Sequence, residues 1–197
     1  FMAIVNLTDD SFSDGGTYQA SDSHLLKHCQ QLVDDGASIL DLGAESTRPG
    51  AEEVGAHAQI NLLSNAMRIL SPINIPLSID TRSAIVADHC LAAGAVMIND
   101  VSAFGDPDMA AAVARHDAQV VLMHSRGTSK TMQQHCDYDY LIGEICDELA
   151  KRINHGLSEG VRPERIIIDP GIGFAKDARQ SFEIIHSLNA FRSLGFP

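Results

Sequence analysis

The chain alternates between two kinds of hydrophobic pattern. Short, nearly continuous runs of Ile, Val and Leu are each followed by a longer segment whose apolar residues recur at helical spacing. The short runs are typical of strands covered on both faces in a parallel sheet, and the longer segments of amphipathic helices. Strands are predicted at 1–7, 38–42, 77–79, 95–98, 119–123 and 165–168; helices are predicted at about 21–35, 52–71, 83–93, 138–160 and 178–194, with a short one opening at 106.

Each apolar run ends in residues that form hydrogen bonds. The repeated strand–helix order predicts an α/β fold. A doubly wound sheet would use only the strand ends at its switch point, whereas a TIM (β/α)8 barrel builds its site from the loops after all strands. Because nearly all strand ends are polar here, the pattern favours the barrel. These polar residues are Asn6, Glu45 to Arg48, Asp80, Asn99 with Asp100, His124 and Asp169.

About six strand–helix units are visible, whereas a closed barrel has eight. The final residues 194–197 resemble an approach to a seventh strand. We therefore expect 1–197 to be a single barrel domain that lacks roughly its last quarter and a short piece before Phe1. The alternative is a partner chain that covers the open edge of the sheet.

Composition narrows the class of protein. With 197 residues, 45% of them apolar, the chain can bury one sizeable core, and no apolar stretch is long enough to predict a membrane span. A net charge of −12 disfavours a nucleic-acid surface. The four cysteines show no C-x-x-C spacing, which indicates a reducing compartment, and we expect the cytoplasm.

Three strand-end residues, Asp80, Asn99 and Asp169, are rich in hydrogen-bond acceptors. Such a set suits a flat heterocycle that presents N–H and NH₂ groups, because a carboxylate accepts two parallel hydrogen bonds. For any one of them, capping of the following helix is an equally good interpretation. The loop after Asp169 contains Gly171 and Gly173, which permit a close backbone approach to a ligand, and Phe174, which could stack on a ring or pack the loop.

Candidate cations and metal ligands are fewer. Arg48 and Arg126 follow strands and could bind a phosphate or carboxylate bidentately, although a solvated loop charge is a better alternative for Arg126 than for Arg48. Lys176 could meet an anion or be solvated. Asn6 precedes an oxygen-rich loop compatible with Mg²⁺, which is also ordinary turn chemistry. His124 is the one histidine that we expect near the site.

Several other chemistries are disfavoured. The chain has no G-x-S-x-G motif and no cysteine at a strand end, so covalent catalysis is not indicated. It also lacks G-x-G-x-x-G after a strand and G-x-x-x-x-G-K-[ST], which disfavours dinucleotide and P-loop nucleotide binding.

With these residues in view, the sequence resembles the dihydropteroate synthase family. The resemblance covers the whole chain, and its first two motifs are the most specific. The matching stretches are Asn6-Leu7-Thr8-Asp9-Asp10-Ser11-Phe12-Ser13-Asp14-Gly15-Gly16, Gly43-Ala44-Glu45-Ser46-Thr47-Arg48-Pro49-Gly50, Ser78-Ile79-Asp80-Thr81, Ile98-Asn99-Asp100, Leu122-Met123-His124-Ser125-Arg126-Gly127 and Asp169-Pro170-Gly171-Ile172-Gly173-Phe174-Ala175-Lys176.

The resemblance implies a TIM barrel that joins (7,8-dihydropterin-6-yl)methyl diphosphate to 4-aminobenzoate in folate biosynthesis. It implies that Asn6 is a Mg²⁺ ligand and that Arg48 lies on a loop closing over the aminobenzoate and the leaving group. It places Thr47, Asp80, Asn99 and Asp169 in the pterin diphosphate site. The expected partners are these small molecules, without nucleic acid or membrane, and a homodimer is left open.

Three departures from the family pattern stand out. Asp9 occupies a position where the family usually has Pro, and Ala44 and Ala175 replace common glycines. The family's later Ser-Arg-Lys and Arg-x-His motifs would lie beyond Pro197. Two alternatives stay open: a pterin-binding methyltransferase domain and a non-catalytic pterin-binding barrel.

Overall fold

The computed structural model describes residues 1–7, 18–45 and 54–197. Within these residues, six strands form one parallel sheet in the order β1-β2-β3-β4-β5-β6. Each strand lies beside its neighbour in sequence, whereas the order of a doubly wound sheet reverses at a switch point. The predicted α/β fold is confirmed, and the strand order is that of a barrel. The strands are β1 (Met2–Asn6), β2 (Ile39–Gly43), β3 (Leu77–Asp80), β4 (Met97–Asp100), β5 (Gln119–Met123) and β6 (Ile166–Asp169).

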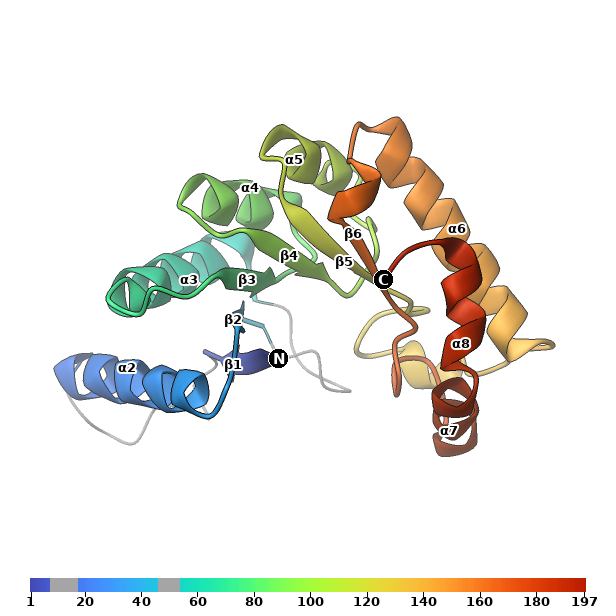
Figure 1. The fold of residues 1–197 in the computed structure, drawn as a ribbon, viewed down its shortest axis with the longest axis horizontal. Helices are drawn as coiled ribbons and strands as arrows, with labels where there is room; N and C mark the ends of the chain where they lie inside the picture. The colour runs from blue at the N-terminus through green and yellow to red at the C-terminus, as the bar shows by residue number, and fades with distance from the viewer. Residues whose placement is uncertain (8–17, 46–53) are drawn as a thin grey trace.

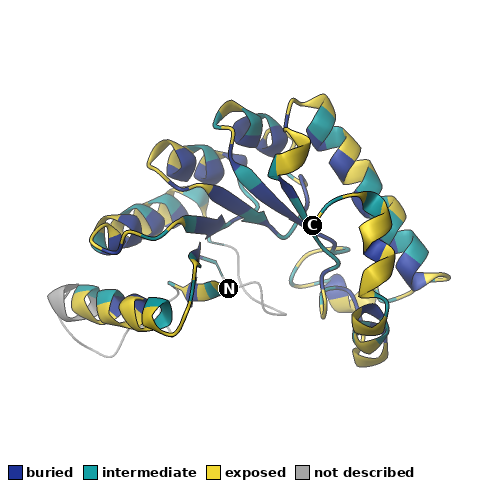
Figure 2. Ribbon diagram, viewed as in Figure 1, coloured by how far each residue is buried: buried dark blue, intermediate teal, exposed yellow. Residues whose placement is uncertain are grey.

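Helices line the outer side of the curved sheet (Figure 1). Their buried faces and the sheet form the main core, while their outer faces are exposed (Figure 2). Within the described residues the α-helices are α2 (Tyr18–Asp34), α3 (Ala56–Leu70), α4 (Ala84–Ala92), α5 (Met109–Arg115), α6 (Leu141–Ser158), α7 (Ala178–His186) and α8 (Leu188–Phe191). Short 3-10 helices are η1 (Met132–Gln134), η2 (Pro163–Arg165) and η3 (Arg192–Leu194).

The prediction of one continuous helix over 178–194 is wrong. The segment breaks at Ser187, whose φ of −106° and ψ of 14° leave the helical region, and continues as α8 and η3. After the break, Phe191 packs in the same small buried cluster as Ile184 of α7 and Leu149 of α6. The change of direction therefore lets both short helices reach one apolar cluster.

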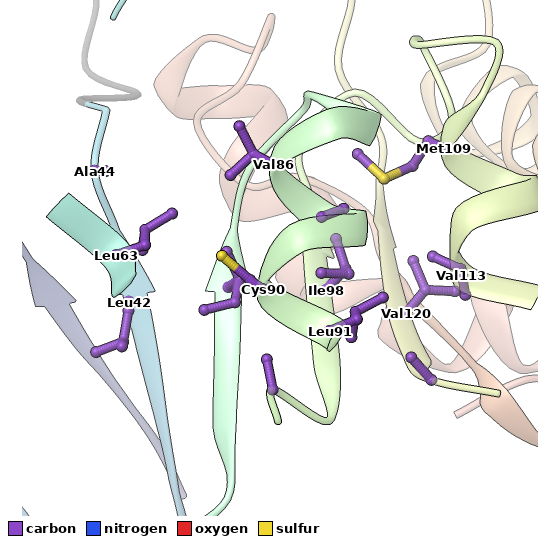
Figure 3. Close-up of a cluster of buried hydrophobic side chains, with 14 of the residues drawn as sticks. Leu42, Ala44, Leu63, Val86, Cys90, Leu91, Ile98, Met109, Val113 and Val120 are labelled. Atoms are coloured by element: carbon purple, nitrogen blue, oxygen red, sulfur yellow. The ribbon is translucent and has the colours of Figure 1, made fainter. Parts of the chain in front are cut away.

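One row of strand residues carries the core. The row has one residue from each of five neighbouring strands. Each of these residues is 0% exposed and is covered by the helices. The helices contribute Leu63, Val86 and Met109 to the same cluster (Figure 3). Because side chains alternate along a strand, residues one step away project from the opposite, concave face. The row consists of Leu42, Ile79, Ile98, Val120 and Ile166.

The last residue lies beside β6. The backbone N–H of Ile168 donates a hydrogen bond of 2.8 Å to the carbonyl oxygen of Pro197. The approach to a seventh strand at 194–197 stays a prediction. Among the described residues, no helix combines the length and apolar character needed to cross a membrane.

Candidate functional site

Three predicted site residues project from the concave face of the sheet. In the strand register, Asn6 pairs with Gly43, Gly43 with Asp80, and Asp80 with Asn99. Paired residues of neighbouring parallel strands project to the same side. A Cβ atom at Gly43 would lie 3.5 Å from Asp80 Oδ2 and 3.6 Å from Asn6 Oδ1. Glycine at this position leaves open the space between the two oxygen atoms.

Asp169 lies on the same face, one side-chain layer closer to the carboxyl ends of the strands. Asn99 pairs with Val121, Val121 pairs with Ile167, and Asp169 follows two residues later. Asp169 Oδ1 accepts a 2.7 Å hydrogen bond from the backbone N–H of Gly171. This bond directs one carboxylate oxygen at the loop and leaves Oδ2 for a ligand. The acceptors expected to share a site therefore share a face, while their roles in binding stay a prediction.

The surroundings of the Asp80 carboxyl group disfavour its ionised form. Burial raises its pKa to about 8, and the negative charges of Asp41, Asp100 and Glu45 contribute to the shift. At neutral pH this group therefore carries a proton much of the time, so that it can donate as well as accept a hydrogen bond. Asp80 and Phe174 line one cavity of about 230 Å³ at the strand ends.

Lys176 is buried and bound by the protein itself. It is 3% exposed, and its ammonium group donates to His124 Nδ1 at 3.0 Å, to the His124 carbonyl at 3.3 Å and to the Phe174 carbonyl at 2.7 Å. The interpretation of Lys176 as a solvated charge is therefore wrong, while contact with a ligand anion stays a prediction. Its contacts tie the loop after β6 to the end of β5. Within that loop Ala175 has a φ of +52°, in the left-handed region that glycine favours.

The Arg126 side chain is also bound by other residues of the protein. It forms ion pairs with Glu144 at 2.7 Å and with Glu148, and its guanidinium lies 4.0 Å from the centroid of the Tyr138 ring. The hydrogen bond from Arg126 lowers the pKa of Glu144. The expectation of a solvated charge is wrong, and these contacts engage Arg126 in fixing the loop after β5 against α6.

His124 lies near the site as expected, but it points into the protein interior. Its Nε2 atom is 3.0 Å from Glu148 Oε2, and burial lowers its pKa to about 4, with the positive charge of Lys176 acting in the same direction. His124 is therefore neutral near pH 7. It links the Lys176 loop to α6 and does not face the concave side as a free base.

Asp41 contacts a site residue, although the strand pattern did not single it out. This residue lies in the middle of β2, is 2% exposed, and its Oδ2 atom accepts a 2.9 Å hydrogen bond from Asn99 Nδ2. Burial raises its pKa. Ser78, its register partner in β3, is close enough to lower that pKa, yet among the described residues neither Ser78 Oγ nor Asp41 Oδ1 has a hydrogen bond of normal geometry. The available signal was a single charged residue inside the apolar run 39–42.

Several predicted residues lie outside the described part of the chain. Thr47 and Arg48 fall in 46–53, and the carboxylates Asp9, Asp10 and Asp14 fall in 8–17. The expectation about Asp9 falls there too.

The donor chemistry at the end of β1 fits Mg²⁺. This ion commonly takes one or two protein oxygens and completes its shell with water and substrate phosphate oxygens. Asn6 offers an amide oxygen on the concave face, on the same side as Asp80 Oδ2. No cluster of three or more His, Cys, Asp or Glu side chains suited to a metal ion occurs within the described ranges. The role of Asn6 as a Mg²⁺ ligand therefore stays a prediction.

The fold and this site define an enzyme of the α/β class whose ligands bind at the carboxyl ends of parallel strands. The sequence model for "Pterin binding enzyme" matches residues 2–197. A curated relative, the dihydropteroate synthase of Synechocystis sp., is 42% identical over 198 residues, which cover 100% of this chain and 68% of that protein. The chain belongs to the pterin-binding enzyme family, in its dihydropteroate synthase branch.

Solved structures support the same placement. A Clostridium difficile dihydropteroate synthase, determined in the presence of pteroic acid, matches with a TM-score of 0.92 and 37% identity over 100% of this chain and 73% of that one. A Xanthomonas albilineans dihydropteroate synthase with 4-aminobenzoic acid matches with a TM-score of 0.90 and 38% identity, covering 100% and 70%. The six-stranded sheet is thus the corresponding part of a TIM barrel.

Proposed function

We propose that this protein joins (7,8-dihydropterin-6-yl)methyl diphosphate to 4-aminobenzoate, giving 7,8-dihydropteroate and diphosphate. The observation that carries the proposal is the strand register, which aligns Asn6, Asp80 and Asn99 on the concave face and adds Asp169 above them. Family membership and relatives with pteroic acid or 4-aminobenzoic acid support the assignment.

The acceptor-rich face suits recognition of the pterin ring. Asp169 keeps Oδ2 for a ring donor while Oδ1 holds its own loop. Asp80, with a pKa near 8, can accept from a ring N–H when ionised or donate to a ring nitrogen when protonated. Phe174 lines the same cavity as Asp80 and can contact a ring face. Binding therefore fixes the exocyclic methylene at the mouth of the strand ends.

The reaction then needs stabilisation of charge more than a protein nucleophile. The C–O bond to diphosphate breaks, the leaving oxygen keeps the electron pair, and the electron-rich dihydropterin supports the positive charge on the methylene. The amine of 4-aminobenzoate forms the new C–N bond with its lone pair and then loses a proton to solvent. Arg48 and Thr47 would act on the leaving group from the second loop. Asn6 would hold Mg²⁺, which supplies positive charge for diphosphate when bound.

A direct assay tests this proposal. The protein is mixed with pterin diphosphate, 4-aminobenzoate and Mg²⁺, and diphosphate release and dihydropteroate formation are measured. We expect equimolar products and a loss of activity in Asp169→Asn. No release by protein that binds pterin would overturn the synthase assignment and favour a non-catalytic barrel.

The alternative of a methyltransferase domain shares the barrel and the strand-end Asp and Asn residues. The stretches Asn6-to-Gly16 and Glu45-to-Gly50 disfavour it, since they match the synthase pattern. Methyl transfer from a methylated pterin to a corrinoid, without diphosphate release, would support that alternative.

A further inference from the structure

A partly buried hydrogen bond joins Asn99, one of the predicted site residues, to Asp41. It runs from Asn99 Nδ2 on β4 to Asp41 Oδ2 on β2, at 2.9 Å, and so crosses over β3. Asp41 is 2% exposed and lies one side-chain layer below the row that contains Asp80 and Asn99. The contact therefore belongs to the floor of the site and does not face a ligand itself.

Burial of the Asp41 carboxylate lowers the stability of the fold, which points to a role for this residue in the site. Removing a carboxylate from water disfavours its ionised form, and buried charges are usually paired with several donors. Among the described residues, Asn99 supplies the one hydrogen bond of normal geometry to Asp41, while Asp41 Oδ1 and the neighbouring Ser78 Oγ have none. Asp41 caps no helix in this part of the chain. Its hydrogen bond of normal geometry goes to one predicted site residue, Asn99.

The chemistry of this pair fixes the direction of the Asn99 amide. In the observed pair Asp41 Oδ2 is the acceptor, as a carboxylate oxygen without a proton must be, whereas an amide has a donor end and an acceptor end. With the amide reversed, Asn99 Oδ1 would stand against Asp41 Oδ2 with no proton between them. The observed orientation leaves Asn99 Oδ1 and its second N–H for a ligand, in a set order.

We propose that Asp41 is a positioning residue that holds the Asn99 amide in one orientation, so that a pterin ring meets its acceptor and donor atoms in a fixed order. This inference rests on the proposed function and deepens it. Asp41 makes the site selective for a ring edge whose donors and acceptors match that order. It acts through Asn99 and does not touch the substrate.

The kinetic test compares Asp41→Asn with Ser78→Ala. The first variant keeps the shape of the side chain but pairs with Asn99 in either amide orientation, and the second alters the register partner in the same layer without removing the Asn99 bond. For Asp41→Asn we expect the KM for pterin diphosphate to rise about tenfold, the equivalent of one charge-assisted hydrogen bond, and the KM for 4-aminobenzoate to change less than about twofold. For Ser78→Ala we expect both constants to stay within about twofold of the original.

A spectroscopic test examines the pair without any substrate. The side-chain NH₂ signals of Asn99, assigned by their disappearance in Asn99→Asp, report its hydrogen bonding in ¹H–¹⁵N NMR spectra. We expect one of the two protons to be shifted downfield and slow to exchange in the original protein and in Ser78→Ala. In Asp41→Asn the two NH₂ protons of Asn99 should have similar chemical shifts and similar exchange rates. The first of these measurements needs no Asp41 variant to fold.

The outcomes separate this inference from the proposed function. If the original protein fails to bind or turn over pterin diphosphate, the proposed function fails, while the NMR signature still reports on the pair. If it turns over pterin diphosphate normally and Asp41→Asn has the same KM, the positioning role is overturned. Equal increases of both KM values, or equal effects of Ser78→Ala and Asp41→Asn, would also overturn it by showing a general packing effect.

Discussion

The ammonium nitrogen of Lys176 lies 3.0 Å from His124 Nδ1, and each of the two side chains is only 3% exposed. An ammonium group has no acceptor, so His124 Nδ1 must accept and the ring proton resides on Nε2, which donates to Glu148 Oε2 at 3.0 Å. This relay joins the loop after β6, the end of β5 and α6. These polar contacts therefore hold the loop that carries Phe174 against the end of β5 and against α6.

Replacement of Lys176 tests how much this relay stabilises the fold. Lys176→Met keeps most of the side-chain length but leaves the carbonyls of Phe174 and His124 and the Nδ1 atom of His124 without their donor. We expect the free energy of unfolding in urea to fall by about 2 kcal/mol or more. Arg179→Met, which removes a 3.4 Å ion pair of a side chain that is 76% exposed, should change it by less than about 0.5 kcal/mol. Equal effects would contradict the relay.

Acid should weaken the fold through His124. Its pKa is lowered from 6.5 to about 4 in the folded protein by burial first and by Lys176 second. Between these two pH values the unfolded chain binds a proton that the folded protein does not, so stability is present above pH 6.5 and is lost as the pH falls towards 4. The linked free energy is about 3 kcal/mol.

His124→Gln isolates this contribution, because glutamine retains a donor and an acceptor but does not titrate. Urea unfolding at several pH values should show a smaller loss for His124→Gln than for the original protein in this window. Parallel curves would mean that other groups, such as Glu144 and Glu148, whose pKa values are lowered by contacts with Arg126, account for the acid sensitivity.

We expect the ionised Asp80 side chain to lower the stability of the folded protein, although its proposed role is to bind the pterin ring. Its pKa is raised from 3.8 to about 8 by burial and by Asp41, Asp100 and Glu45, so the folded protein binds more protons than the unfolded chain between these values. Stability contributed by the protonated form is therefore lost as the pH rises through this range. Asp80→Asn should raise the free energy of unfolding at pH 7.5 by about 1 kcal/mol or more, and the gain should shrink towards pH 4. A pH-independent gain would contradict this cause. Pterin affinity should fall in the same variant.

Gly171 and Gly173 offer a matched pair for testing the loop after β6. Both have positive φ, +70° and +83°, so alanine is strained at either position. A Cβ atom at Gly171 would lie 1.9 Å from the His124 carbonyl oxygen, whereas nothing lies within 4 Å of one at Gly173. We expect Gly173→Ala to cost about 1 kcal/mol in urea unfolding, and Gly171→Ala to cost at least about 3 kcal/mol or to prevent folding. Similar costs would show that close packing against β5 is unimportant.

The sequence predicted the parts of the site that depend on strand pattern. An apolar run followed by a polar residue placed Asp80, Asn99 and Asp169 at strand ends, and the two-residue alternation of a strand puts them on one face. The pattern could not show that Asp41, a charged residue within an apolar run, projects inward, because both faces of these strands are largely buried. Nor could it show that Lys176 folds back under its own loop, since that depends on the positive φ of glycines and on contacts with β5.

Substitution of Asp169 tests ring recognition with the least damage to the fold. Its Oδ1 atom accepts from the Gly171 N–H at 2.7 Å, and the single oxygen of an asparagine can still accept that bond. The NH₂ group of Asp169→Asn would then take the place of Oδ2 and face the ring donors with a donor of its own, leaving buried polar groups unpaired. We expect pterin affinity to fall by about tenfold to a hundredfold in calorimetry, with much smaller effects on 4-aminobenzoate and on the melting temperature. Equal losses for both ligands would contradict the assignment of Asp169 to the ring.

Asp177→Asn serves as the control, because Asp177 caps α7 through the Gln180 N–H and should affect stability without changing the preference between the two ligands.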